Sequence, residues 1–504
     1  MQWKRWHVWF LFCITVWAAC IAGCQRTPPS LSVPTPPHQG IELRVACPTE
    51  ATAALLRERG QPWALRQGVK LVLVRPDSAR TAELPDAASA DVWIIPPSDL
   101  PRWAADGRLA AVPDKYTTRE SPYAWPDVLP LYREQLIVWE DAPRGLPLIG
   151  ESPVCCYRTD LLEAPAHQTA LSKLLGGKPT APVTWEQFAQ LAEYFREHGA
   201  DGRPGPSLPP LPRDDAELDR LFYTIAAAFA RRAVAAGEPR RAGHQDDVFS
   251  FHYDLKTGEP RISAPGFVHA LKLLKRLQPC RPAEPAERPE EAFRAGRAAL
   301  CLSDAPWVKT FQETPDLHDK VGVCPVPGGD RYFEFDSGKA HPAPEGNRVP
   351  YLGGAGWLAV VPRASPHADA AFDLLAELSG PETSKQVFLS ATRFGGPLRG
   401  EQLYRHRWDS FDLPETQTLQ LQKALQEALL HRGLKNPALC LRTPRQAAHR
   451  AALVKEVRAA LRQDTDAEKA LQNVAEAWKK LDREQGVEKH RADYRRSLGL
   501  LARN

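Results

Sequence analysis

One stretch, residues 144–162, limits the possible folds of this chain more than any other. A short apolar run, Leu146–Ile149, is followed by a polar break at 150–153 and by a second apolar run at 154–157. Glycine and proline in the break let the backbone change direction without a continuous strand. The pattern predicts a crossing between two lobes, with Glu151 at the floor of the cleft that the lobes would form.

The segment that precedes this crossing alternates between short apolar runs and amphipathic ones. Strands are expected at 41–46, 69–74 and 91–95, with helices after the first and the third. This alternation predicts an α/β lobe whose strands pair in parallel. Ligands of such sheets bind at the carboxyl ends of the strands, which places Glu50 and Asp99 near a binding site.

The N-terminal residues predict a signal peptide at 1–23. A basic start leads into the largely apolar run 8–19, and small residues precede Cys24. This ending resembles the bacterial lipobox, whose cysteine becomes an acylated mature N-terminus and anchors the protein to the membrane. An uncleaved anchor or an ordinary signal peptide are the alternatives, and Gln25 leaves the choice between inner and outer membrane open. Residues 24–40 are rich in proline and predict an extended tether.

Composition excludes several classes of function. The 504 residues contain 65 Lys and Arg against 61 Asp and Glu, and a dedicated nucleic-acid binder would show a basic excess. No GxSxG, HExxH, P-loop or dinucleotide motif is present. The cysteines after Cys24 have no spacing typical of zinc, so most are expected to be small buried side chains, with one disulfide left open.

Several motifs in the expected order resemble one protein family. They comprise Gly145-Leu-Pro147 with Tyr157 and Asp160-Leu-Leu162, then Pro182-x-Thr-Trp-x-x-Phe188, Phe293-x-x-Gly-x-Ala-Ala299 before Trp307, and the glycine-rich 351–360. Together they are similar to family 1 extracellular solute-binding proteins, the maltose-binding-protein-like components of ABC importers. The resemblance runs from about 41 to 481, and residues 484–504 have no counterpart in it.

The resemblance implies a two-lobed α/β fold of the type II periplasmic-binding-protein kind, each lobe having a mixed, mostly parallel sheet flanked by helices. Lobe 1 would comprise 41–148 and 352–403, and lobe 2 would comprise 149–351 with C-terminal helices at 404–483. Residues 484–504 would form a tail. Closure would occur at a hinge formed by 149–152, notably Gly150, and by Gly353 and Gly354.

A sugar site needs flat apolar surface for the ring and polar groups for the hydroxyls. The candidates are Trp307, Trp357 and Tyr157 for stacking, and Glu151, Glu50, Asp99, Asp304 and Arg399 for hydrogen bonds. Each candidate also has a structural interpretation. Trp357 would belong to the core, Tyr157 would pack at the hinge, and Asp99 and Asp304 would cap helices.

These features predict a lipid-anchored monomer that binds a small solute, most simply a carbohydrate, and delivers it to an ABC permease. No metal or cofactor is expected. Residues 95–97 and 437–443 lack the aromatic side chains that sugar-binding members often place there, so polyamines stay open as ligands. A sensory or interaction lipoprotein and a carbohydrate-active enzyme are the alternative functions.

Overall fold

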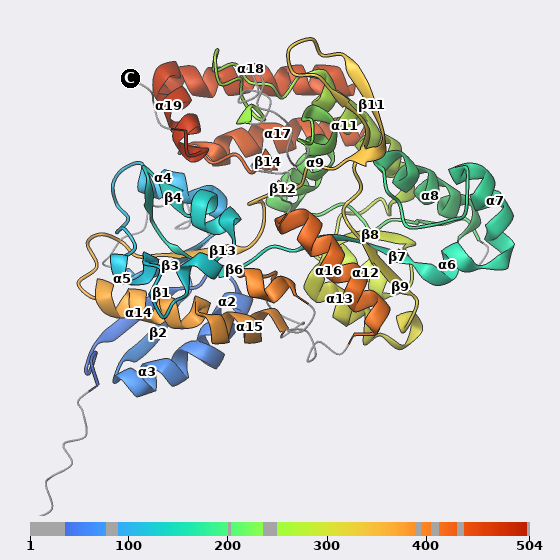
Figure 1. Ribbon diagram of the computed structural model, residues 1–504. Helices are drawn as coiled ribbons and strands as arrows, with labels where there is room; N and C mark the ends of the chain where they lie inside the picture. Colours follow the sequence, from blue (N-terminus) through green and yellow to red (C-terminus); the bar gives the residue numbers. More distant parts are fainter. Residues whose placement is uncertain are drawn as a thin grey trace, which may run out of the picture.

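The computed structural model describes residues 36–76, 89–199, 203–234, 249–389, 395–404, 413–430 and 438–500. The predicted signal peptide, Cys24 and most of the predicted tether lie outside these ranges. Among the described helices, none combines the length and apolar character needed to cross a membrane. Two sheets with their covering helices form two lobes, and the chain crosses between them (Figure 1).

The first sheet has five strands in the order β2-β1-β3-β13-β6. β1 pairs in parallel with β2 and β3, as the α/β pattern predicts, whereas β13 is antiparallel to both of its neighbours. The strands are β1 (Glu42–Ala46), β2 (Lys70–Val74), β3 (Val92–Ile95), β6 (Leu146–Ile149) and β13 (Trp357–Val360).

Helices on the first lobe begin and end where the sequence provides local signals. Thr49 caps α2 (Glu50–Leu55) by accepting a hydrogen bond from the Thr52 N–H. Gly68, at φ +70°, ends α3 (Gln61–Gln67). A π-helical turn, Leu56–Gly60, joins these two helices. The remaining helices of this lobe are α4 (Leu100–Ala104), α5 (Asp114–Thr117), α14 (Ala368–Ser379) and α15 (Pro381–Leu389).

The second sheet has three strands in the order β8-β7-β9 and is antiparallel throughout. Its strands are β7 (Pro153–Arg158), β8 (Leu300–Asp304) and β9 (Val321–Cys324). The expectation of a mostly parallel sheet is therefore wrong for this lobe. Helix α13 (Ala305–Gln312) lies between β8 and β9 in sequence. These two strands run in the same direction but do not pair, because β7 lies between them and is antiparallel to both.

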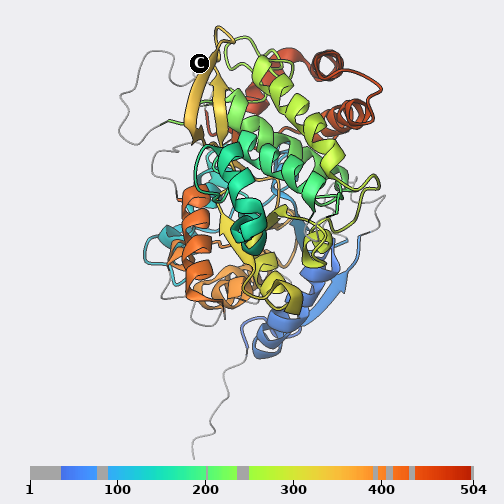
Figure 2. The same ribbon diagram turned by 90° about the vertical axis from the view of Figure 1, so that its right-hand side faces the viewer.

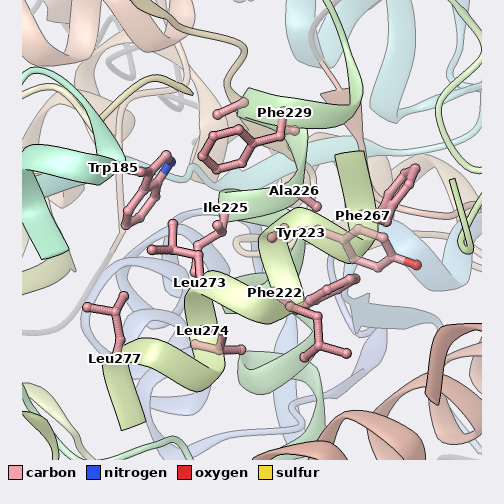
Figure 3. Close-up of a cluster of buried hydrophobic side chains, with 14 of the residues drawn as sticks. Trp185, Phe222, Tyr223, Ile225, Ala226, Phe229, Phe267, Leu273, Leu274 and Leu277 are labelled. Carbon is pink, nitrogen blue, oxygen red and sulfur yellow. The ribbon is translucent and has the colours of Figure 1, made fainter. Parts of the chain in front are cut away.

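Helices build most of the second lobe (Figure 2). α8 (Trp185–His198), α9 (Asp215–Ala230) and α11 (Pro265–Leu277) pack together around side chains such as Trp185, Phe222 and Phe267 (Figure 3). A capping box begins α8, because Thr184 accepts from the Gln187 N–H and Gln187 accepts from the Thr184 N–H. Other elements here are α6 (Thr159–Glu163), α7 (Pro165–Leu175), α12 (Glu290–Arg294), α16 (Glu415–Leu429) and the hairpin β10 (Gly329–Phe333) with β11 (Ala340–Asn347).

The chain crosses between the two sheets where glycines were expected. It leaves β6 of the first sheet and enters β7 of the second through 150–152. It returns from β12 (Tyr351–Leu352), which pairs with β14 (Ala438–Leu439), through 353–356 into β13. A further segment packs against the first crossing, since the Gly396 N–H donates to the Gly150 carbonyl at 2.7 Å.

The C-terminal residues correct one prediction. Asp466 caps α18 (Ala467–Gln485), because its carboxylate accepts from the Glu468 and Lys469 N–H groups. Residues 484–500 do not form a tail: α19 (Val487–Ser497) follows Gly486 and buries Tyr494 against the second lobe. α17 (Gln446–Leu461) and α18 pack side by side, and α19 contacts α18 (Figure 1).

All seven described cysteines are buried and unbridged, as the hydrophobic interpretation predicts for most of them. Cys155 faces Cys324 across β7 and β9, and Cys156 faces Cys301 across β7 and β8. Helix α14 begins at Ala368, and Ser365, just before it, hydrogen-bonds to Asp91 at 2.7 Å.

Candidate functional site

A cavity of about 380 Å³ lies on the second lobe beside the first crossing. Two of the residues expected to bind ligand, Asp304 and Trp307, line it together. The wall also includes the start of β7, one face of α9 and a proline-rich segment. The remaining lining residues are Pro153, Val154, Phe188, Leu208, Pro209, Pro210, Pro212, Glu217, Arg220, Leu221, Thr224, Arg281, Glu287, Arg288, Pro289, Glu290, Leu302, Ser303 and Val326.

Helix α9 presents a mixed face to this cavity. Glu217, Arg220 and Thr224 recur at intervals of three and four residues, so they lie on one side of the helix. The Asp214 carboxylate starts the helix by accepting from the backbone N–H groups of Ala216 and Glu217 at 2.8 and 3.0 Å. The opposite side of α9 is apolar and buried, which fixes the direction of the polar face.

Arg220 and Asp304 form an ion pair in the cavity wall. The Arg220 Nη2 lies 2.8 Å from Asp304 Oδ2, and the Ser152 N–H donates to Asp304 Oδ1 at 3.2 Å. Asp304 precedes α13 but makes no capping hydrogen bond to it. Its carboxylate instead joins α9 to the first crossing, so the helix-cap interpretation of Asp304 is wrong.

Trp307 supplies a flat apolar surface to the same wall. It lies in the first turn of α13, is partly buried, and stacks on Phe311 with ring centroids 5.7 Å apart and an interplanar angle of 25°. Phe311 is itself fully buried, so the indole rests on a rigid support. A supported aromatic face beside hydrogen-bonding groups is the surface that a sugar ring or an apolar ligand requires.

Two further cavity residues have unusual environments. Burial, with the neighbouring carboxylates of Asp304 and Glu217, raises the pKa of Glu290 to about 7. Arg281 donates through Nη1 to the Pro209 carbonyl at 2.7 Å, but its buried Nε has no hydrogen-bond partner among the described residues. Burial lowers the pKa of Arg281 to about 10. An unpaired donor and a carboxyl group that titrates near neutrality both favour polar ligands.

Glu151 is buried between the two crossings and does not line the cavity. Its Oε1 accepts from the backbone N–H of Gly353, and its own N–H donates to the Tyr132 hydroxyl at 3.0 Å. Burial raises the pKa of Glu151 to about 8, although the Gly353 N–H and the Arg220 charge oppose this shift. The predicted place of Glu151 at the crossing is correct, but its hydrogen bonds are to the protein itself.

The carboxyl end of β3, where Asp99 was expected to meet a ligand, is in contact with α17. The Gln446 Nε2 donates to Asp99 Oδ1 at 2.5 Å, and the Arg450 Nη2 donates to Ser98 Oγ at 3.1 Å. The space that remains here is about 20 Å³. Asp219 borders it, and burial raises the pKa of this carboxyl group to about 7. Asp99 therefore joins the two lobes in this conformation, and it makes no helix-capping bond.

The other predicted site residues lie apart from the cavity. Glu50 is exposed and pairs with Arg57 at 2.7 Å. Tyr157 is buried on β7, where its ring lies against Gly322, and Trp357 packs on the core at the start of β13. Arg399 is 1% exposed, and its guanidinium donates to the carbonyls of Tyr123, Ala124 and Ser379.

Sequence reasoning missed most of the charged lining, including Glu217, Arg220, Arg281 and Glu290. For α9 a signal exists, because charged residues interrupt an otherwise apolar helix at helical spacing. For Arg281 and Glu290 no signal was available. Both lie near a proline-rich connection, 282–289, whose path depends on tertiary packing.

Residues 69–401, more than half of the chain, match the family of bacterial extracellular solute-binding proteins. The chain belongs to that family, whose members work outside the cytoplasm. The two lobes and their glycine-rich crossings agree with this assignment. No curated protein matches the sequence.

Solved structures with the same fold include maltose-bound MalE3 of T. maritima, with 17% identity and a TM-score of 0.61 over 88% of this chain and 100% of that one. The sugar-binding protein MalE of Xanthomonas citri matches with 17% identity and a TM-score of 0.62 over 89% and 99%. A solute-binding protein of an ABC transporter from Agrobacterium radiobacter K84, in complex with ribitol, matches with 17% identity and a TM-score of 0.63 over 88% and 100%.

Proposed function

We propose that this protein captures a small polyhydroxylated solute, a carbohydrate or polyol, and delivers it to an ABC transporter permease. The observation that carries the proposal is the cavity of about 380 Å³, in which Trp307 lies beside the Arg220–Asp304 ion pair. Its volume falls in the range of small-molecule sites. The ligands in the similar structures named above, maltose and ribitol, belong to the same chemical class.

Each part of the cavity has a role in this proposal. The Trp307 ring stacks on the C–H face of the solute. Arg220, Asp304, Glu217 and Glu290 hydrogen-bond its hydroxyl groups, and the unpaired Nε–H of Arg281 gains an acceptor. A site built to pair hydroxyl groups rejects solutes that lack them, because its own polar atoms would then stay buried and unpaired. Glu50, Tyr157, Trp357 and Arg399 are not included among the ligand-binding residues.

Closure between the two lobes is the second part of the proposal. The hinge is the pair of crossings at Gly150 and at Gly353 and Gly354, and the lobes are 41–148 with 352–403 and 149–351 with the C-terminal helices. The contacts of Asp99 with Gln446 and of Ser98 with Arg450 would form on closure and break on opening. Hinge closure around a ligand requires only a few residues to absorb the torsion.

The location of the protein completes the proposal. Residues 1–23 would be removed, Cys24 would carry lipid, and residues 24–40 would hold the folded part away from the membrane. The protein would act as a monomer, since the permease receives one loaded binding protein. No metal, cofactor or catalytic step is needed for this function.

The test is a thermal-shift screen of the mature protein, followed by calorimetric titration of each stabilising solute. The panel should include maltose and longer maltodextrins, ribitol, mannitol, amino acids and polyamines. A ligand at a hundred times its Kd should stabilise the fold by about 2.7 kcal/mol. Stabilisation by sugars or polyols that Trp307→Ala abolishes and Tyr404→Ala retains would support the proposal, since Tyr404 is 48% exposed and does not line the cavity.

A sensory or interaction lipoprotein is the alternative function. It predicts that no solute in the panel shifts the unfolding temperature, because solute binding at the cavity would then have been lost. Stabilisation by amino acids or polyamines alone would keep the transport function but refute the proposed class of solute.

A further inference from the structure

A second cluster of chemically active side chains lies outside the solute cavity, where the three C-terminal helices meet. His449 of α17, Asp482 of α18 and His490 of α19 each offer one atom that can bind a metal, and these atoms lie within 4.8 Å of one another. The His449 Nε2 is 2.8 Å from Asp482 Oδ1, and the His490 Nδ1 is 3.3 Å from the same oxygen. None of the three residues lines the cavity.

The cluster is buried but incompletely hydrogen-bonded. His449, Asp482 and His490 are 0%, 4% and 2% exposed. Neither ring nitrogen of His490 makes a hydrogen bond, and Asp482 Oδ2 also has no partner among the described residues. Leaving a buried polar group unpaired costs about 1–3 kcal/mol. An imidazole that makes no hydrogen bond and a carboxylate oxygen without a hydrogen-bond partner are groups that a bound cation would satisfy.

The orientation of His449 suits metal binding. Its Nδ1 lies 3.0 Å from the Arg445 carbonyl oxygen, so Nδ1–H is the donor there. In a neutral ring the Nε2 lone pair then faces the Asp482 carboxylate at 2.8 Å, and a metal ion or a proton shared by the two groups would offset the repulsion between them. A histidine that binds a metal usually donates its other N–H to a carbonyl or carboxylate in this way.

We propose that His449, Asp482 and His490 bind one divalent transition-metal ion, Zn²⁺ being the representative. Two imidazole nitrogens and one carboxylate oxygen form a donor set that Zn²⁺ accepts. Bonds of about 2.0–2.2 Å in a tetrahedron separate the ligand atoms by roughly 3.3–3.6 Å. The cluster therefore needs only small side-chain movements. The Tyr253 hydroxyl donates to Asp482 Oδ1 at 3.3 Å and would orient this carboxylate, and a water molecule would complete the coordination.

The position of the site defines its role. The three ligands come from three successive helices, and Gly486, at φ +95°, provides the turn that brings α19 back towards the end of α18. The nearby Arg445 is paired with Glu484 at 3.0 Å, which weakens the repulsion between its charge and a bound cation. The ion would fasten α19 to α17 and α18 and would stabilise the second lobe without entering the solute site.

The test uses Zn²⁺ itself and the mature wild-type protein. The protein is stripped with a chelator, the chelator is removed, and the protein is dialysed against ZnCl₂. Metal content is then measured by mass spectrometry and stability by thermal unfolding. We expect one Zn²⁺ per chain and a higher Tm. The test variants are His490→Gln and Asp482→Asn. The control is His167→Gln, because His167 is a partly buried histidine that hydrogen-bonds to Tyr194 on the other side of the lobe.

The proposal requires that His490→Gln and Asp482→Asn each lower Zn²⁺ occupancy at least tenfold and lose the rise in Tm, while His167→Gln behaves as wild type. Absence of bound Zn²⁺ in the wild-type protein, or equal occupancy in all variants, would overturn it. Co²⁺ added to the stripped wild-type protein provides a readout that does not depend on any variant folding. Visible absorption bands typical of four- or five-coordinate Co²⁺ support the site, and the weak spectrum of hydrated Co²⁺ refutes it.

Discussion

The carboxylate of Glu151 accepts a hydrogen bond from the backbone N–H of Gly353, and this contact joins the two crossings between the lobes. The two residues lie 202 positions apart in sequence, yet each lies in a break between two strands. A buried carboxylate therefore holds the backbone at the place where hinge motion is proposed. The protonation state of the Glu151 carboxyl group and the backbone geometry at the crossings should both influence the stability of the fold.

Replacing Glu151 with Gln should change how stability depends on pH. Burial raises the folded-state pKa of Glu151 to about 8, above the ordinary glutamate value of 4.5, so between pH 4.5 and 8 the folded protein holds a proton that the unfolded chain has lost. The stability that this group contributes is complete below pH 4.5 and is lost as pH rises towards 8, by at most about 1.4 kcal/mol per pH unit. Chemical unfolding at several pH values should show a shallower decline for Glu151→Gln.

Glu50→Gln is the control for that experiment, because Glu50 is exposed and its hydrogen bond with Arg57 lowers its pKa. This variant should keep the wild-type decline between pH 4.5 and 8. Parallel curves for wild type and Glu151→Gln would show that the Glu151 carboxyl group does not titrate in this range.

Gly150→Ala should destabilise the fold, because a β-carbon at this position would lie 2.4 Å from the Pro397 carbonyl oxygen. Backbone atoms of another segment cannot move aside as a flexible side chain does, so we expect a loss of about 1–3 kcal/mol in chemical unfolding. Gly177→Ala is the matched control, since nothing lies within 4 Å of its added carbon. Equal stability of the two variants would contradict the close packing of 395–397 against the crossing.

The crossings were predictable because their signal is local. Glycine and proline limit the backbone wherever they occur, so 150–153 and 353–356 could be read without knowledge of their surroundings. The parallel pairing of β1 with β2 and β3 followed from the alternation of strand and helix. The pairing of β7 with β8 and β9 did not, because about 140 residues separate β7 from β8 and no local pattern fixes which strand it meets.

The candidate site was predictable only in part, for a related reason. Trp307 and Asp304 were found through a motif, and the cavity contains both. Arg399 was a candidate too, but its side chain turns into the protein and hydrogen-bonds to backbone carbonyls. Residue type and spacing indicate which groups are available, whereas burial and hydrogen-bond partners decide whether a group can meet a ligand.

Arg220 and Asp304 should show strong energetic coupling. Each is largely removed from water, with side chains 17% and 24% exposed, and losing either leaves the other charge with fewer partners. A double-mutant cycle with Arg220→Met and Asp304→Asn should give a coupling energy of about 1–3 kcal/mol in chemical unfolding. The control cycle uses the exposed pair Arg213 and Glu287, whose side chains are 64% and 69% exposed and whose coupling should stay below about 1 kcal/mol.

Arg399→Met should lower stability without changing solute affinity. The substitution leaves the carbonyls of Tyr123, Ala124 and Ser379 buried without their shared donor, and we expect a loss of about 3 kcal/mol or more. Arg57→Met, which breaks an exposed ion pair, should cost less than about 1 kcal/mol. A stable Arg399→Met protein with weakened solute binding would restore Arg399 to the ligand-binding residues.

Tyr494→Ala should show that α19 is part of the folded core. The Tyr494 ring is 3% exposed, lies 5.1 Å from the Tyr253 ring between centroids, and its hydroxyl accepts from the His252 N–H at 3.2 Å. Removing a buried aromatic ring typically costs about 3–5 kcal/mol, so Tyr494→Ala should lower the free energy of unfolding by this amount. Tyr404→Ala, at a position 48% exposed, should change it by less than about 1 kcal/mol. If both variants unfold at the wild-type denaturant concentration, α19 does not contribute to the cooperative unit, and residues 484–504 behave as the tail that sequence alone suggests.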